Sequence, residues 1–211
     1  TNYTEDERLA PGFFFRKWAT MPELEQLALE HAKGKILDVG AAAGCHALEL
    51  QKKGLEVTAL EKSELAADVM KRRGVRKVVC TDLYRFHESG FDTVIVLMNG
   101  TGIGQTIKGL EKMLLHLKRL MNSGGKLLID SSDIQYLFQE GDGSFWVDLA
   151  NKNYIGEMEY ELIYKNLCTR FKWLFTDAET LAAVAKQVGL SCKVIYNGEQ
   201  NDFLAELRLD E

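Results

Sequence analysis

The chain has few prolines, few cysteines and no long hydrophobic run. Its 211 residues include 2 prolines and 4 cysteines. The cysteines are scattered without a C-x-x-C pair, which argues against a zinc site and a disulfide framework and favours a reducing, cytoplasmic location. No apolar run approaches the ~18–20 residues of a membrane-spanning helix. The N-terminal segment also lacks the basic-then-apolar order of a signal peptide. We therefore expect a protein that acts without a membrane.

An excess of positive charge is also missing. The chain carries 26 Lys and Arg against 31 Asp and Glu, a net charge of −5. This balance lacks the basic footprint of a nucleic-acid-binding protein. The one basic cluster, at residues 71–77, is better explained as a helix C-terminus, where cations are favoured by the helix dipole. We therefore expect no nucleic-acid partner.

The chain is rich in alternating strand and helix patterns. Its length predicts one domain over residues 1–211. Apolar runs at residues 35–39, 55–60, 78–80, 91–98 and 127–129 each precede a helical pattern or a turn, and capping boxes at 20–23 and 176–179 predict helix starts. Two last strands, near 192–196 and 203–209, flank a turn-rich segment and predict an antiparallel hairpin. The order predicts a doubly wound α/β fold with a mostly parallel sheet.

A small-residue turn follows the first of these strands. Gly40-x-Ala42-x-Gly44 lies between the strand at 35–39 and a helix at 45–53. Small residues in such a turn let the backbone approach a ligand. A dinucleotide site requires G-x-G-x-x-G, and here the third glycine comes one place too early. Ala42 replaces the middle glycine, which we expect to be tolerated if its φ is negative.

Polar residues follow the strands at corresponding positions. Ligands of doubly wound sheets bind outside the carboxyl ends of the strands, near the switch between the first and fourth. The residues found there are Asp38, Glu61, Asp82, Asn99 and Asp130. This set predicts the location of the binding site.

With Asp38 two places before Gly40, the turn resembles motif I of the class I S-adenosylmethionine (SAM)-dependent methyltransferases, of the bacterial small-molecule type. The resemblance implies a seven-stranded sheet of order 3-2-1-4-5-7-6 and SAM as cofactor, with S-adenosylhomocysteine as product. It also implies the site residues. The turn residues Gly40, Ala42 and Gly44 would lie under the ribose and methionine, Asp38 would orient the methionine amino group, Glu61 would bind the ribose hydroxyls, Asp82 and Leu83 would bind the adenine, and Asn99 would contact the methionine or the acceptor.

A general base is optional for methyl transfer, because placement of the acceptor lowers the barrier by itself. Three residues are weak candidates by position: His46, Asp130 and Tyr136. The helix dipole would lower the pKa of His46 and favour a neutral base, although a polar contact at the helix start is the alternative role. The sequence shows no metal-ligand pattern, and we expect no metal.

Two segments flank this core. Residues 131–175 hold 10 of the 20 aromatic residues. Alternating Met158 to Tyr164 and Arg170 to Phe175 predict two antiparallel strands with an aromatic face, and Tyr136, Phe138, Phe145, Trp146 and Tyr154 predict a lid or pocket wall. Residues 1–34 form an N-terminal cap segment and first helix, whose aromatic stretch at 13–18 either covers the cofactor or packs the helix on the sheet.

The sequence thus favours an enzyme that moves a methyl group from SAM to a small-molecule acceptor by direct in-line transfer. A non-catalytic SAM-binding protein, an NAD(P)-dependent oxidoreductase and a methyltransferase for protein or RNA are the alternatives. The acceptor, the methylated atom and the oligomeric state stay open at this stage.

Overall fold

Seven strands form one mixed sheet in the computed structural model, which describes residues 10–139 and 153–209. In spatial order they are β3 (Lys77–Cys80), β2 (Glu56–Glu61), β1 (Lys35–Val39), β4 (Phe91–Val96), β5 (Met121–Ser132), β9 (Asp202–Leu209) and β8 (Leu190–Asn197). Strands β1 to β5 pair in parallel, and β9 runs antiparallel to both β5 and β8. Since β8 and β9 are the sixth and seventh strands of this sheet along the chain, the predicted order 3-2-1-4-5-7-6 is confirmed.

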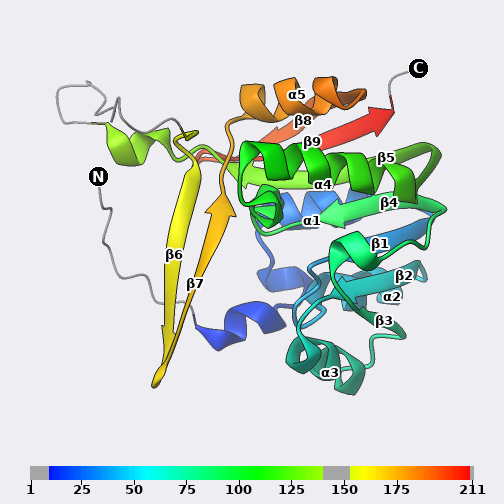
Figure 1. Cartoon of the computed structure of the whole chain (residues 1–211). Coiled ribbons are helices and arrows are strands. Elements are labelled where there is room, and N and C mark those ends of the chain that lie inside the picture. The colour runs from blue at the N-terminus through cyan, green and yellow to red at the C-terminus, as the bar shows by residue number, and fades with distance from the viewer. Residues whose placement is uncertain (1–9, 140–152, 210–211) are drawn as a thin grey trace.

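Helices cover both faces of the sheet (Figure 1). The α-helices are α1 (Glu23–His31), α2 (Cys45–Lys52), α3 (Glu64–Arg72), α4 (Ile107–Leu120) and α5 (Ala178–Gln187). Short 3-10 helices are η1 (Pro11–Phe15), η2 (Trp18–Thr20), η3 (Leu83–Arg85), η4 (Gly100–Gly104) and η5 (Gln135–Phe138). Side chains of α1, α2 and α3 pack in one hydrophobic cluster and those of α4 and α5 in the other. The arrangement is the predicted doubly wound fold.

The central strands are buried on both faces, as their continuous apolar runs predict. In β1, Ile36 belongs to the cluster under α1 and α2, while its neighbour Leu37 belongs to the cluster under α4. Both side chains are fully buried. Because successive side chains of a strand point to opposite faces, one short strand supports both layers.

The chain reverses its winding direction at β1, which pairs with β2 on one side and with β4 on the other. Asp38, near the end of β1, is level with Ala59 of β2 and Ile95 of β4. The loops after these three parallel strands therefore leave the sheet at the same edge, where such folds bind ligands.

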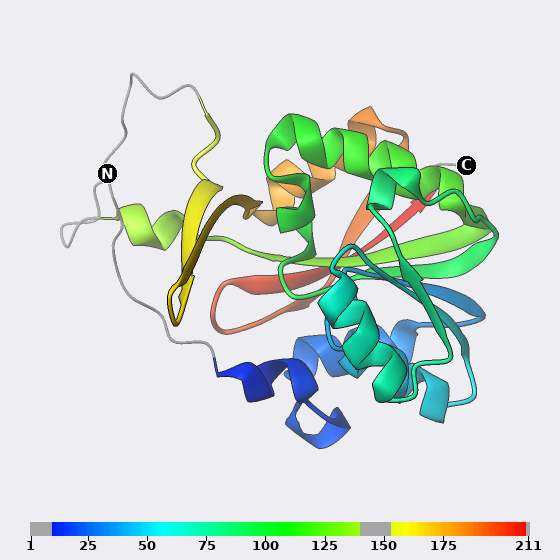
Figure 2. The same ribbon diagram turned by 60° about the horizontal axis from the view of Figure 1, so that its bottom comes forward.

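Strands β6 (Glu157–Tyr164) and β7 (Leu167–Leu174) form a separate two-stranded sheet. Tyr160 pairs with Phe171, so the predicted antiparallel pair with an aromatic face is confirmed, and Glu159 pairs with Lys172 on the other face. This hairpin stands beside the carboxyl ends of the parallel strands (Figures 1 and 2). Phe145 and Trp146, assigned to a lid from the sequence, lie outside the described residues.

Both predicted capping boxes differ from the structure in detail. The Thr20 hydroxyl accepts a hydrogen bond from the Lys17 amide and closes η2, so α1 begins later, at Glu23. Helix α5 begins one residue later than its box predicts. Its cap is Asp177, whose Oδ1 accepts from the Thr180 amide at 2.7 Å. At the first box a competing local hydrogen bond occupies the expected capping group. At the second, the Thr176 hydroxyl has no hydrogen-bond partner among the described residues, and Asp177 caps the helix instead.

Candidate functional site

The small-residue turn after β1 is held against β2. The amides of Gly40 and Ala41 both donate to the Leu60 carbonyl, at 2.9 and 3.1 Å. Gly40, Ala42 and Gly44 all have positive φ, at 70°, 48° and 79°. The condition under which alanine was expected to be tolerated there, a negative φ, is therefore not met. The turn uses the left-handed region at all three positions, so alanine occupies a conformation that favours glycine.

Packing also favours glycine at Gly40 and Gly44, because a side chain there would come close to neighbouring side chains. A Cβ atom on Gly44 would come within 2.8 Å of Val75 and 2.9 Å of Met70, next to α3. A Cβ on Gly40 would meet the Ile103 side chain at 3.3 Å. Because Gly44 has no side chain, α2 can begin close against α3. Because Gly40 has none, its backbone can lie close to η4.

Glu61, at the end of β2, ties the turn to the next loop. Its Oε2 accepts from the Ala42 amide at 3.0 Å and its Oε1 from the Ser63 amide at 2.9 Å. A carboxylate oxygen can accept two hydrogen bonds, so each oxygen keeps capacity for a further donor. Two such oxygens side by side match a pair of neighbouring hydroxyl groups on a ligand.

Asp38 is only 2% exposed, and its Oδ2 has no hydrogen-bond partner among the described residues. Burial raises its pKa to about 6, assisted by the charges of Glu61 and Glu25 and opposed by His46 and a backbone hydrogen bond from Ala47. An unpaired oxygen on a buried carboxylate is costly unless a ligand supplies the donor. Asp38 can therefore hold a cationic or N–H-bearing group at the end of β1.

Asp82 and Leu83 follow β3, the third strand whose carboxyl end lies at this edge of the sheet. Asp82 accepts from the Tyr84 amide through Oδ1 at 2.9 Å and thereby caps η3. Leu83 is buried in the same cluster as Val39 and Leu60. The three acidic residues predicted for the site thus lie at the ends of three adjacent strands.

The Asp130 side chain is hydrogen-bonded to the backbone at Asn99. Asn99 has φ 56°, and Asp130 accepts from the amides of Asn99 and Gly100, each at 2.9 Å, through separate carboxylate oxygens. The Asn99 Oδ1 accepts from the Ser132 hydroxyl at 2.9 Å. Burial raises the pKa of Asp130 to about 6, although the two backbone hydrogen bonds oppose the shift. Asp130 thus holds the turn after β4 in its left-handed conformation.

His46 is a buried cation. Its Nε2 lies 2.8 Å from Oε2 of Glu25. Burial opposes the positive charge, but the Cys45, Glu25 and Asp38 side chains together outweigh it and raise the His46 pKa to about 10. The predicted lowering of this pKa by the helix dipole was wrong, because close acidic groups dominate. A protonated imidazole has no lone pair with which to act as a base.

Tyr136, the third residue considered as a base, lies in η5 and is 54% exposed. The structure instead brings other residues to the turn after β4. The Thr101 and Ser131 hydroxyls lie 2.8 Å apart, Thr101 donates to the Leu174 carbonyl at 3.0 Å, and the Thr176 amide donates to Ser131 at 2.8 Å. These contacts fix the end of β7 to η4.

Sequence reasoning missed Glu25 and Arg16 as well. Glu25 is 4% exposed, on the face of α1 that buries Leu24, Ala28 and Leu29. A charged residue inside a helical apolar stripe is a signal that the sequence does contain. Arg16 is 8% exposed and lies in the aromatic N-terminal stretch.

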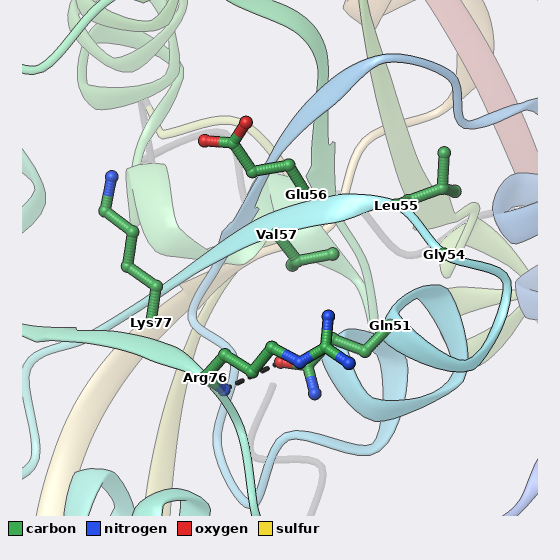
Figure 3. Close-up of a pocket in the computed structure, with 7 residues that line it drawn as sticks. All are labelled: Gln51, Gly54, Leu55, Glu56, Val57, Arg76 and Lys77. Atoms are coloured by element: carbon green, nitrogen blue, oxygen red, sulfur yellow. Dashed lines mark hydrogen bonds between the residues drawn. The ribbon is translucent and has the colours of Figure 1, made fainter.

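A depression of about 230 Å³ lies elsewhere, between the loop after α2 and the first residues of β2 and β3 (Figure 3). It is lined by Gln51, Glu56, Arg76 and Lys77 among others, and the Arg76 amide donates to Gln51 at 2.7 Å. Because it opens at the amino ends of the strands, it is separate from the site at the carboxyl ends.

Within residues 10–139 and 153–209, no group of three His, Cys, Asp or Glu side chains is placed to hold a metal ion. None of the described helices is long and apolar enough to cross a membrane.

Comparisons with known proteins find methyltransferases. A methyltransferase domain family model matches residues 37–129, from β1 to β5. The crystal structure of a SAM-dependent methyltransferase from Bacteroides fragilis, in complex with S-adenosyl-L-homocysteine, is 39% identical, with a TM-score of 0.89, and the match covers 97% of this chain and 84% of that one.

More distant structures share the fold. The CcbJ methyltransferase from Streptomyces caelestis is 12% identical with a TM-score of 0.66, covering 90% of this chain and 91% of that one. The glycopeptide N-methyltransferase MtfA, complexed with S-adenosyl-L-homocysteine, is 17% identical with a TM-score of 0.61, covering 89% and 86%. Comparison with curated protein sequences found no match.

The Bacteroides fragilis structure is similar over nearly the whole chain, from the N-terminal cap to the terminal hairpin, at an identity that demonstrates common descent. The chain belongs to the family of S-adenosylmethionine-dependent methyltransferases.

Proposed function

We propose that this enzyme binds SAM at the carboxyl ends of β1, β2 and β3 and transfers its methyl group directly to a small-molecule acceptor. The observation that carries the proposal is the buried Asp38 oxygen without a partner, at the switch point of the sheet. The methionine portion of SAM ends in an ammonium group, which is the donor that such an oxygen lacks. The residues present therefore fit this cofactor.

In this proposal the other residues follow from their geometry. The turn formed by Gly40, Ala42 and Gly44 would lie beneath the ribose and methionine. Glu61 would accept from both ribose hydroxyls, since each of its oxygens has one remaining acceptor position. Asp82 would accept from the adenine amino group beside Leu83. Asn99 would present its amide nitrogen toward the methionine portion or the acceptor.

SAM supplies a sulfonium whose methyl group is electrophilic. The chain's own contribution is then to orient the acceptor and exclude water. Placement of the reacting atoms at ~3–3.5 Å is worth ~7–11 kcal/mol of barrier. His46 is paired with Glu25, and both oxygens of Asp130 accept backbone hydrogen bonds. The proposal therefore assigns neither residue the role of a base and describes direct in-line transfer to an acceptor that ionises readily.

The acceptor would enter beside the β6–β7 hairpin, within the insertion at residues 131–175. The second strand of the hairpin ends next to η4, where Trp173 contacts Gly102. The net charge of −5 favours a small molecule over nucleic acid as acceptor. The four cysteines are free thiols, which agrees with a proposed cytoplasmic location.

The proposal is tested by calorimetric binding of SAM, S-adenosylhomocysteine and NAD to the wild type, to Glu61→Ala and to Glu56→Ala. Glu56 begins the same strand at its opposite end and serves as the matched control. We expect micromolar binding of the two adenosyl ligands, weakened tenfold or more (about 1.4 kcal/mol) only by Glu61→Ala. Binding of NAD alone, or equal effects of both substitutions, would contradict the proposed site.

A non-catalytic SAM-binding protein is the second candidate, because both positioned candidates for a base are already engaged. The two are separated by incubating the enzyme with SAM and a panel of small-molecule acceptors and measuring release of S-adenosylhomocysteine. Acceptor-dependent release supports the enzyme, and tight binding without release for the whole panel supports the binding protein.

A further inference from the structure

Four charged residues are buried together beneath the glycine turn. Arg16 is 8% exposed, Glu25 4%, His46 5% and Asp38 2%. They come from four separate parts of the chain: the N-terminal segment, α1, the first turn of α2 and β1. Their charges alternate in sign from Arg16 to Asp38.

The first three are joined by short hydrogen bonds. Arg16 Nη2 donates to both carboxylate oxygens of Glu25, at 2.6 and 2.7 Å. Glu25 Oε2 lies 2.8 Å from His46 Nε2. Arg16 also donates to the Phe13 carbonyl, and its guanidinium lies 3.7 Å from the centre of the Phe13 ring. The N-terminal segment is therefore fixed to the first turn of α2 through Glu25.

A second contact joins the same two regions. Arg73, at the end of α3, donates to the Ala43 carbonyl of the glycine turn at 2.5 Å and to the Phe14 carbonyl at 3.5 Å. Its guanidinium lies 4.9 Å from the centre of the Phe15 ring. The N-terminal segment thus contacts the cofactor turn from two sides.

Buried charges are costly unless they are paired, and well-packed hydrophobic residues of similar volume often stabilise a protein interior at least as well. Stability by itself therefore does not account for a cluster of four buried charges. Asp38 faces the carboxylates of Glu25 and Glu61, and both favour its protonated form, while the His46 cation favours the charged form. His46 itself faces Cys45, Glu25 and Asp38.

We propose that Arg16, Glu25 and His46 are positioning residues that keep Asp38 ionised for the ammonium group of SAM, which makes the N-terminal segment a working part of the cofactor site. This inference rests on the proposed function. None of the three residues needs to touch the cofactor, because the effect is carried by the charge of His46 and by the Arg16–Glu25 and Glu25–His46 pairs that hold it in place.

The direction of the effect follows from the charges. The His46 cation lowers the pKa of Asp38, so removal of that charge raises it. Asp38 would then be protonated over a wider pH range, and SAM would lose its partner at neutral pH. At alkaline pH Asp38 ionises even without His46, so the lost affinity returns.

His46→Gln tests this because glutamine keeps an N–H donor for Glu25 and removes the charge. SAM affinity is measured for variant and wild type from pH 6 to pH 8.5. The ratio of the two dissociation constants cancels the titration of the SAM amino group, whose ordinary pKa is about 8. We expect His46→Gln to bind about tenfold more weakly at pH 6.5 and within about threefold of wild type at pH 8.5.

Lys126→Gln is the matched control, since it breaks the Lys126–Glu206 pair, whose side chains are 10% and 14% exposed, far along β5 from the site. For Lys126→Gln we expect the ratio of variant to wild-type dissociation constants to be the same at every pH. The same result for His46→Gln would mean that His46 has a purely structural role and would overturn the inference. A wild type that does not bind SAM would instead overturn the proposed function.

Arg16→Gln and Arg16→Lys provide a second pair in case His46→Gln does not fold. Loss of the Arg16 charge leaves Glu25 less neutralised, which raises the pKa of Asp38, whereas lysine keeps the charge. We expect Arg16→Gln to show the same pH-dependent loss, at about threefold near pH 6.5, and Arg16→Lys to restore the wild-type profile. Equal profiles for the two variants would contradict the inference.

Discussion

The Trp173 indole lies against the backbone of Gly102, so close that a Cβ atom on Gly102 would come within 1.9 Å of the ring carbon Cε2. Gly102 belongs to η4, directly after the fourth strand of the sheet, and Trp173 belongs to β7 of the separate hairpin. This contact, with the Thr101 hydrogen bond to the Leu174 carbonyl, places the hairpin next to the turn that follows β4.

Gly102→Ala should displace the indole and destabilise the fold by ~1–3 kcal/mol, the usual effect of overpacking. Urea unfolding followed by tryptophan fluorescence measures it. Gly12→Ala is the control, because no heavy atom lies within 4 Å of a Cβ there. In a Trp173→Ala background the Gly102 substitution should become nearly neutral. An additive effect in the double variant would show that the two residues do not interact.

Ala42→Gly should leave SAM binding within about twofold and stabilise the protein by up to ~1 kcal/mol. The left-handed conformation costs an alanine ~1–2 kcal/mol, and the greater entropy of glycine in the unfolded chain offsets part of the gain. Ala41→Gly, at a neighbour without positive φ, should instead destabilise by ~0.5–1 kcal/mol. Thermal unfolding of both variants tests this prediction. Equal losses of stability in the two variants would argue against a strained backbone at Ala42.

Asp38→Asn should weaken SAM binding and increase the free energy of unfolding at neutral pH. Burial raises the Asp38 pKa from its ordinary 3.8 to about 6, so its stabilising contribution is complete below pH 3.8 and is lost as the pH rises through 6. Relative to the wild type, the free energy of unfolding of Asp38→Asn should therefore increase by on the order of 2–3 kcal/mol between pH 4 and pH 7. Urea titrations at both pH values test this. A difference that does not change with pH would refute it.

Asp130→Asn should destabilise the turn after β4 by ~1–3 kcal/mol. Both Asp130 oxygens accept backbone amides, so either orientation of an asparagine places its NH₂ group against an N–H donor. Asp133→Asn is the control, since among the described residues only the Oδ1 of Asp133 accepts, from the Gln135 amide at 2.9 Å, and asparagine can keep that bond. Chemical unfolding of the two variants should differ accordingly. A stable Asp130→Asn with slow turnover would instead favour Asp130 as a base.

Periodicity and turn residues predicted the doubly wound fold, the hairpin at the end of the sheet and the second hairpin of the insertion. These signals are local. The order of the strands came instead from the resemblance to the methyltransferase family. Alternation from Met158 to Tyr164 and from Arg170 to Phe175 predicted two antiparallel strands with an aromatic face, and the structure supplies the register, in which Tyr160 pairs with Phe171. The family resemblance likewise rested on a contiguous motif, and Asp38, Glu61 and Asp82 could be placed because strand ends are visible in the sequence.

The sign of φ at Ala42 and the charge of His46 could not be predicted in this way. The first depends on how the turn meets β2 through Leu60 and Glu61. The second depends on Glu25, which is 21 residues away along the chain and reaches His46 only because α1 packs on α2. A helix dipole acts locally and could be anticipated, but the stronger field of a buried carboxylate could not.

The sequence by itself therefore determined the architecture, the resemblance to the family and the edge of the sheet at which we propose that SAM binds. Tertiary structure alone decided the charges and hydrogen bonds at that edge. It fixed which carboxylates accept hydrogen bonds, which oxygen is left without a donor, and which histidine is positively charged. The physical reason is that hydrophobic periodicity is written in neighbouring residues, whereas burial and charge pairing depend on distances between segments that only the folded chain brings together.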